Sequence, residues 1–249
     1  MDLQNDKIDI MGIGINNLDM DGSVALLRDM LDNKECGYVV TPNAEFLYAA
    51  LKQKDGKFKS TLNSAVLACC DGVGVYYASK ILGCKLKGRV PGIELAENLM
   101  AKTQGEYSFF FLGSRPGIAE KAEEKLKEKY PKLNVCGTND GYFKKDEAVV
   151  EKIKQSKADV VFVCLGYPKS EYWMEENIAK TGCTLMLSLG GSLDGYAGEI
   201  KRAPKFFRKL GLEWLYRLIK QPSRIGRMMS LPKFMFMTIG YRIKHGKNR

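Results

Sequence analysis

The sequence contains a single histidine, His245, and this scarcity limits the chemistry that the protein can perform. A Ser–His–Asp triad, a Cys–His pair and a histidine-bound metal each place a histidine inside the site. His245 lies instead within a strongly basic C-terminal stretch. We therefore expect catalysis to depend on carboxylates, hydroxyls, amides and arginines, with no metal and no other cofactor.

Several further patterns are missing. No run approaches the ~20 apolar residues of a membrane-spanning helix, and the polar start MDLQNDKIDI is unlike a signal peptide. The seven cysteines form no CxxC pair, which is typical of a reduced, cytoplasmic protein. Neither GxxxxGK[ST] nor GxGxxG occurs, so a P-loop and a standard dinucleotide fingerprint are excluded.

Charge is distributed unevenly along the chain. Residues 201–249 contain 14 Lys and Arg and one acidic residue, a net charge of +13, whereas residues 1–200 carry −3. A basic segment of this kind binds phosphate, either on nucleic acid or on an anionic membrane surface. We therefore predict a body over residues 1–200 and a separate basic appendage over residues 201–249.

Apolar side chains in the appendage recur at helical spacing between the basic ones. Such an amphipathic pattern is typical of a helix that lies in a membrane interface. Packing of the apolar face on the body, or on a second copy of the chain in a homo-oligomer, is an alternative, and nucleic-acid binding is another. The residues concerned are Phe206, Phe207, Leu210, Trp214, Leu215 and Leu218, followed by the Met- and Phe-rich run 228–239.

The body alternates short β-rich runs with helical patterns. Continuous apolar runs such as VVFVCL indicate strands buried on both faces, hence a parallel sheet in a Rossmann-like α/β fold. We expect strands over 37–41, 65–70, 107–112, 160–165 and 184–189, with a weaker one near 133–136. We expect helices over 23–33, 44–54, 75–82, 93–103, 117–129, 146–156 and 170–180.

Glycine or small polar residues follow five of these strands, in TPN, DGVG, GSRPG, GYPKSE and GGSLD. Ligands of open parallel sheets bind at the carboxyl ends of the strands, where glycines admit a ligand to the backbone and helix N-termini attract anions. The pattern favours a nucleotide-type ligand. The only DxD, Asp19–Asp21, is more typical of a helix cap than of a cation site.

The order of these motifs resembles the WecG/TagA/CpsF glycosyltransferase family from about residue 8 to residue 235. The resemblance rests on TPNAEFL, DGVGV, GRVPGIEL, GSRPGIAEKA, DGYF, LGYPKSE, GGSLDGYAGEIKRAP and GLEWLYRL…PSRIGR. It implies an inverting transfer of N-acetylmannosamine from UDP to undecaprenyl-diphosphate-linked N-acetylglucosamine, during synthesis of a teichoic acid-type polymer. It also implies attachment to the inner face of a bacterial membrane, and no nucleic-acid partner.

The resemblance assigns roles to individual residues. Asp71 resembles the family's catalytic base, although the same residue could simply cap a helix. Arg89 matches an arginine that would stabilise the leaving UDP, although it could also be a plain surface arginine. The remaining matches are to donor contacts at Thr41 and Asn43, uracil contacts at Tyr142 and Asp194, backbone donors at Gly190 and Gly191, and lipid-diphosphate contacts at Arg217, Arg224 and Arg227.

One position departs from the family pattern. Ser170 stands where the family usually carries glutamine, and a hydroxyl offers fewer hydrogen bonds than an amide over a shorter reach. A direct contact between Ser170 and the donor sugar is therefore not expected. We expect either that a water bridges Ser170 and the sugar, or that the enzyme transfers another hexose, such as glucose or N-acetylmannosaminuronic acid. A non-catalytic protein that binds nucleotides or nucleic acid is the alternative of a different class.

Overall fold

The computed structural model describes residues 6–103, 105–200, 203–204, 206–207, 211–220, 222 and 225–246. Its centre is a six-stranded sheet in the order β4-β3-β8-β7-β5-β6, with every neighbouring pair parallel. This confirms the predicted α/β class. The strands are β3 (Gly37–Val40), β4 (Leu67–Ala68), β5 (Ser108–Gly113), β6 (Asn134–Asn139), β7 (Val160–Cys164) and β8 (Leu185–Ser188).

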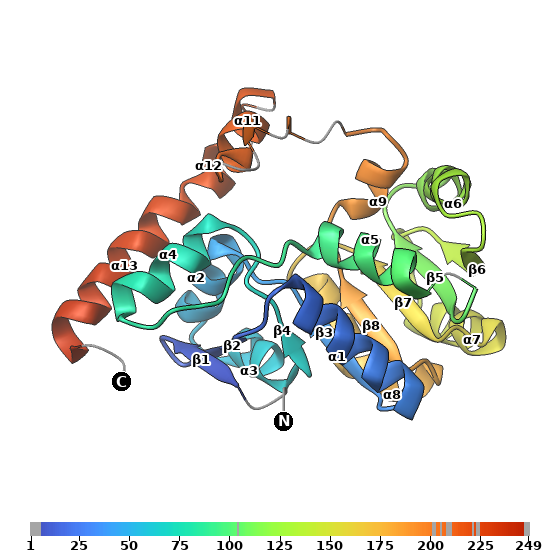
Figure 1. Ribbon diagram of the computed structural model, residues 1–249, viewed down its shortest axis with the longest axis horizontal. Coiled ribbons are helices and arrows are strands. Elements are labelled where there is room, and N and C mark those ends of the chain that lie inside the picture. Colours follow the sequence, from blue (N-terminus) through green and yellow to red (C-terminus); the bar gives the residue numbers. More distant parts are fainter. Residues whose placement is uncertain are drawn as a thin grey trace.

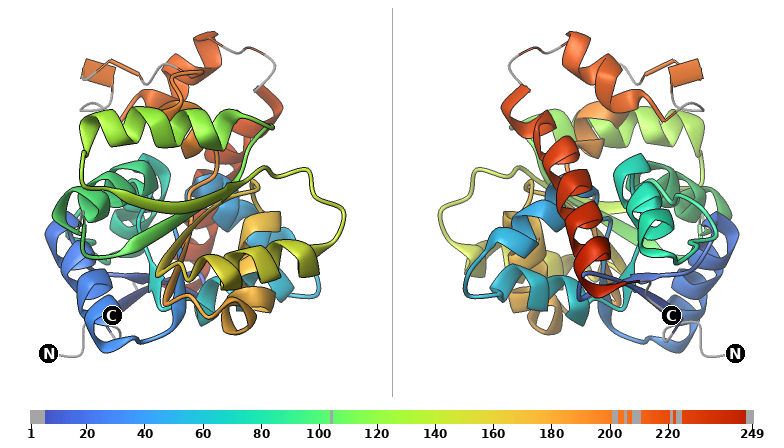
Figure 2. Two further views of the ribbon diagram at one scale, coloured as in Figure 1. Left: turned by 90° about the vertical axis from the view of Figure 1, so that its right-hand side faces the viewer. Right: turned by 90° about the vertical axis from the view of Figure 1, so that its left-hand side faces the viewer.

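Two layers of helices cover the sheet, because alternate strand residues point to opposite faces. Phe110 and Leu112 of β5 join one core cluster, while Phe109 and Phe111 join the other. The first cluster is covered by α2 (Ala44–Lys52), α3 (Lys57–Ser64), α4 (Val73–Leu82), α7 (Asp146–Ser156) and α8 (Lys169–Thr181). The second is covered by α1 (Met20–Asn33), α5 (Gly92–Thr103), α6 (Ile118–Lys129) and α9 (Ser192–Tyr196). Figure 2 shows α6 and α7 on opposite sides of the sheet.

Several elements differ from the expectations. A hairpin of β1 (Lys7–Ile10) and β2 (Ile13–Asn16) precedes α1, and α3 adds a helix that the sequence analysis missed. The predicted strand over 65–70 is reduced to the two residues of β4, because the chain then turns into the loop that carries Asp71. Asp19 caps α1 by accepting a hydrogen bond from the Gly22 backbone at 2.8 Å, as the DxD pattern indicated.

The C-terminal helices are α11 (Glu213–Lys220), α12 (Ile225–Met228) and α13 (Ser230–His245). Figure 1 shows α13 lying along α2 and α4, and Figure 2 shows the same helix from its outer side. Phe234 is fully buried in the first core cluster, and Arg242 donates to the carbonyl oxygen of Leu82 at 3.1 Å. The inward face of α13 therefore packs on the body. Within the described residues, no helix is both long and apolar enough to cross a bilayer.

Candidate active site at the carboxyl edge of the sheet

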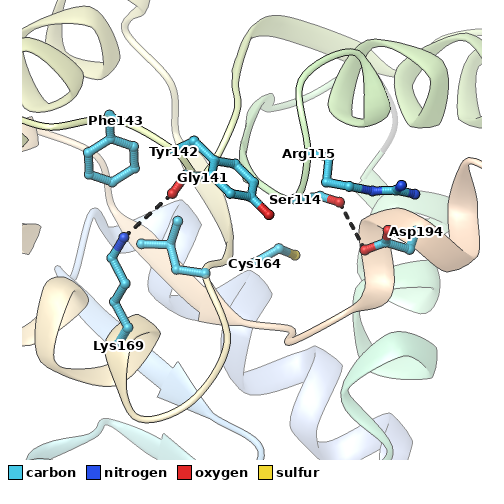
Figure 3. A pocket seen from close by; sticks show the side chains of 9 residues that line it. Ser114, Arg115, Gly141, Tyr142, Phe143, Cys164, Lys169 and Asp194 are labelled. Atoms are coloured by element: carbon cyan, nitrogen blue, oxygen red, sulfur yellow. Dashed lines mark hydrogen bonds between the residues drawn. The ribbon is translucent and has the colours of Figure 1, made fainter.

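A cavity of about 620 Å³ opens where the chain reverses direction across the sheet. The connection after β5 leads outward to β6, whereas the connection after β7 leads inward to β8. Ligands of open α/β sheets bind at such a switch point. The lining residues are Ser114, Arg115, Gly141, Tyr142, Phe143, Cys164, Leu165, Lys169 and Asp194 (Figure 3).

Tyr142 and Asp194, the two side chains expected to contact uracil, both line this cavity. The Tyr142 side chain projects into it from the loop after β6, and 71% of that residue is exposed (Figure 3). The Asp194 carboxylate accepts a hydrogen bond from the Ser114 hydroxyl at 2.9 Å, which fixes its direction. An exposed ring offers a stacking surface for a base, and a carboxylate accepts its N–H groups.

Two cations flank the cavity, and sequence reasoning missed both. Arg115 follows β5 and lies 3.9 Å from the Glu199 carboxylate. Lys169 begins α8 on the opposite side, 4.8 Å from the centre of the Phe143 ring (Figure 3). The motifs GSRPG and GYPKSE contained the signal, since each places a basic residue just after a buried strand. The pair gives the cavity a positive rim that suits a phosphorylated ligand.

The loop after β8 contains Gly190 and Gly191. Gly190 adopts a φ of +53°, and a Cβ atom built on either glycine would meet no atom within 4 Å. The space above this backbone is therefore open. Gly191 immediately precedes α9, so a ligand could approach the backbone here as the sequence analysis predicted.

Thr41 and Asn43 follow β3, the next strand along the edge. The Thr41 hydroxyl is buried and donates to the carbonyl oxygen of Ser188 at 3.1 Å, which ties β3 to β8. The Asn43 side-chain oxygen caps α2 by accepting from the backbone N–H groups of Glu45 and Phe46 at 2.9 and 3.2 Å. Both side chains thus have structural partners, and their donor-contact role stays a prediction.

Asp71 lies in the loop after β4, at the edge of the sheet. Its backbone N–H donates to the Pro42 carbonyl at 3.2 Å, which holds this loop beside the loop of Asn43. The cap position of α4 is occupied by Gly72, with a φ of +83°, and not by Asp71. Asp71 is therefore not the N-cap residue of α4.

Arg89 lies in the segment next to the Asp71 loop. The backbone N–H of Val90 donates to the Cys70 carbonyl at 2.8 Å, and Arg89 itself is half-buried. The pKa of the Cys70 thiol is raised to about 12, mainly by burial and further by the Asp71 carboxylate, while the Arg89 guanidinium opposes the shift. The backbone bond between Val90 and Cys70 thus holds the Arg89 segment beside the Asp71 loop at one corner of the edge.

Ser170 is fully buried, and its hydroxyl oxygen accepts a hydrogen bond from the Leu165 backbone at 3.0 Å. This bond holds the turn between β7 and α8. Replacing Ser170 by Ala should lower the free energy of unfolding by about 1 kcal/mol, because one hydrogen bond is lost. Urea denaturation measures this effect. A variant as stable as the wild type would show that the bond adds nothing to the turn.

The arginines of the appendage are only partly described. Arg227 on α12 donates to the Glu45 carboxylate, its Nε lying 2.8 Å from Oε1. Arg217 belongs to α11, but its side chain lies outside the described residues, as does all of Arg224. Among the residues that the structure describes, no cluster of His, Cys, Asp and Glu could hold a metal ion.

The sequence profile described as "Glycosyl transferase WecG/TagA/CpsF family" matches residues 8–248. The chain belongs to this family. It is similar to the N-acetylglucosaminyldiphosphoundecaprenol N-acetyl-beta-D-mannosaminyltransferase of Staphylococcus aureus, with 35% identity over 92% of this chain and 91% of that enzyme. The enzyme of that name from Bacillus spizizenii is also 35% identical, over 82% of this chain and 79% of its own length. The protein is thus a glycosyltransferase.

Proposed function

We propose that the protein transfers N-acetylmannosamine from UDP to N-acetylglucosamine linked to undecaprenyl diphosphate. The names of the Staphylococcus and Bacillus relatives describe this acceptor and this sugar. At 35% identity they support the reaction class more firmly than the individual sugars. Membership of the family favours a catalyst over the non-catalytic binding protein that the sequence also left open.

The order of the loops along the carboxyl edge is the observation that carries this proposal. Tyr142 and Asp194 mark one end, Gly190 lies after the middle strand β8, and Asn43 and Asp71 follow β3 and β4 at the other end. At about 4.8 Å between strands, the span from the β5–β7 cavity to β4 is about 17 Å. An elongated donor fits this order, with its base in the cavity, its diphosphate over the glycines and its sugar beside Asp71.

Asp71 and Arg89 supply complementary chemistry at the sugar end. The Asp71 carboxylate takes the proton of the acceptor hydroxyl as that oxygen attacks the anomeric carbon. The bond between the anomeric carbon and the UDP oxygen breaks at the same time, and the Arg89 guanidinium stabilises the negative charge that develops on UDP. Attack from the side opposite the leaving group inverts the anomeric centre.

A donor screen tests the proposed function. The full-length protein is incubated with a lipid-diphosphate-linked N-acetylglucosamine acceptor and one UDP-sugar at a time, and UDP release and the glycolipid product are both measured. We expect product with UDP-N-acetylmannosamine. Product only with UDP-glucose or with the N-acetylmannosaminuronic acid donor would change the assigned sugar, and no acceptor-dependent UDP release from any donor would refute the function.

We further propose that residues 201–249 dock on the anionic inner surface of the cell membrane. The outward face of α13 carries large apolar side chains: Phe236 is 74% exposed, Ile243 80% and Ile239 42%. Their spacing places them on one stripe of the helix, with the exposed Lys233 and Lys244 beside it. An apolar stripe with a basic rim is the surface that an interfacial helix presents to lipid.

Vesicle flotation checks the docking surface. Replacing Phe236, Ile239 and Ile243 together by Ser should abolish flotation with anionic vesicles, whereas replacing all three by Leu should preserve it. Binding of the wild type should weaken from 0.1 M to 1 M salt, because the Debye length falls from about 10 Å to about 3 Å. If the Ser variant floats as well as the Leu variant, this face is not the docking surface.

A further inference from the structure

Glu45 joins three separate segments of the chain at one carboxylate. It lies in the first turn of α2, and its side chain is only 14% exposed. It accepts hydrogen bonds from the Tyr167 hydroxyl at 2.8 Å and from Nε and Nη2 of Arg227 at 2.8 and 3.4 Å. The first turn of α2, the turn between β7 and α8, and α12 therefore meet at this residue.

Ring contacts reinforce this junction. The Arg227 guanidinium lies 5.6 Å from the centre of the Tyr167 ring, and that ring stacks on Phe46 at 4.6 Å. The hydrogen bond to Glu45 raises the pKa of Arg227, so the guanidinium stays charged. Burial, followed by the bond to Glu45, raises the pKa of the Tyr167 hydroxyl to about 12, so it stays a donor at neutral pH.

Other residues of the appendage contact the first turn of α4, directly after the loop that carries Asp71. A Cβ atom built on Gly211 would lie 2.1 Å from Cγ1 of Val73. A Cβ on Gly74 would lie 2.7 Å from Cδ1 of Leu231. Val73 and Gly74 directly follow the Asp71–Gly72 turn. The appendage is thus packed against the start of α4, in addition to its bond with α2.

Glu45 also connects this junction to Asn43. Its backbone N–H is held by the Asn43 side-chain oxygen at 2.9 Å, while its own carboxylate holds α12. We infer that Glu45 is a positioning residue that fixes α12 and the β7–α8 turn against the Asn43 and Asp71 loops. This inference rests on the proposed function for its kinetic consequences, but the junction itself can be tested without activity.

Glu45 can hold the junction because the Tyr167 hydroxyl and the Arg227 guanidinium both donate to its carboxylate. Without the Glu45 charge, Arg227 loses both of its hydrogen bonds and Tyr167 keeps a half-buried hydroxyl without its acceptor. The Arg227–Glu45 pair ties α12, a helix of one turn, directly to α2. Movement of α12 then changes the surface beside the Asn43 and Asp71 loops, and loss of the Tyr167 bond loosens one side of the cavity between β5 and β7.

Two readouts on Glu45→Ala test the inference. Hydrogen exchange should speed up in residues 225–231 and in the first turn of α8, and remain unchanged in α6. In the transfer assay, kcat/KM for the lipid acceptor should fall by roughly 10- to 100-fold, since misplacement by about 1 Å can cost ~100-fold. KM for the UDP-sugar should change less, because Ser114, Tyr142 and Asp194 line its proposed cavity from loops outside the junction. The matched control is Glu123→Ala on α6, which removes the 2.6 Å ion pair with Lys127 and should change neither readout.

A double-mutant cycle that combines Glu45→Ala with Arg227→Gln tests whether the two residues act together or independently. If Glu45 acts through Arg227, the double variant should be no worse than the more impaired single variant, because residues of one network do not add. Additive losses, or unchanged exchange in residues 225–231, would overturn the inference. A wild-type protein without transfer activity but with the expected exchange pattern would refute the proposed function and leave the junction standing.

Discussion

Replacing Asp71 by Asn is expected to lower the turnover of glycosyl transfer by ~10²–10⁴-fold, the range that a general base contributes. Asparagine keeps the size of the side chain but cannot take up a proton. The loop should remain in place, because it is held by backbone bonds from Asp71 to Pro42 and from Val90 to Cys70. Single-turnover kinetics with saturating donor and acceptor measure the chemical step directly.

UDP binding provides the control for this variant, since the cavity proposed for the base lies at the other end of the edge. Calorimetry should therefore give the same affinity for wild type and Asp71→Asn. Asp19→Asn is a matched substitution at a helix cap, where Asn and Asp are equally good, and should leave turnover unchanged. Near-normal turnover of a folded Asp71→Asn variant would remove Asp71 from the mechanism.

The second large effect concerns stability. Replacing Phe234 by Ala should lower the free energy of unfolding by about 3–5 kcal/mol, because the substitution leaves a cavity in a packed core. Phe234 is 0% exposed and packs within the cluster that contains Leu47 and Val75 of α2 and α4. Urea denaturation at fixed pH measures the loss.

Phe236 offers an internal control two residues further along the same helix. It is 74% exposed, so Phe236→Ala should change the free energy of unfolding by less than about 0.5 kcal/mol. Phe234→Ala tests the face of α13 that packs on the body, and Phe236→Ala tests the face proposed for docking. Equal destabilisation by both would mean that α13 does not pack on the body as described.

Regular patterns made most of the fold predictable. The helix over 146–156 and the strand that begins at Val160 lie where periodicity and apolar runs placed them. The hairpin of β1 and β2 was missed although Ile13 and Ile15 alternate with polar or small residues, because its tight turn uses a left-handed Met11 with a φ of +56°. A non-glycine residue in that conformation gives no signal in the sequence.

The candidate site was predictable only in part, for a geometric reason. The resemblance to the family points to Tyr142 and Asp194, but the sequence does not specify the order of the strands, so it cannot show that their loops share one cavity. Arg115 and Lys169 were missed because a basic residue after a strand is common on protein surfaces. The Glu45–Arg227 pair joins residues 182 positions apart, and no periodic pattern reports such a contact.

The place of α13 also has a consequence for the folding of the newly made chain. Residues 230–245 complete a core whose other walls, α2 and α4, are synthesised more than 140 residues earlier. Contacts between such distant segments form late in folding. Apolar surface that stays exposed until then promotes aggregation. Until α13 has left the ribosome, the nascent protein exposes the apolar side chains of α2 and α4 that pack with Phe234 in the folded state. Biosynthesis, and not only catalysis, therefore depends on the C-terminal segment.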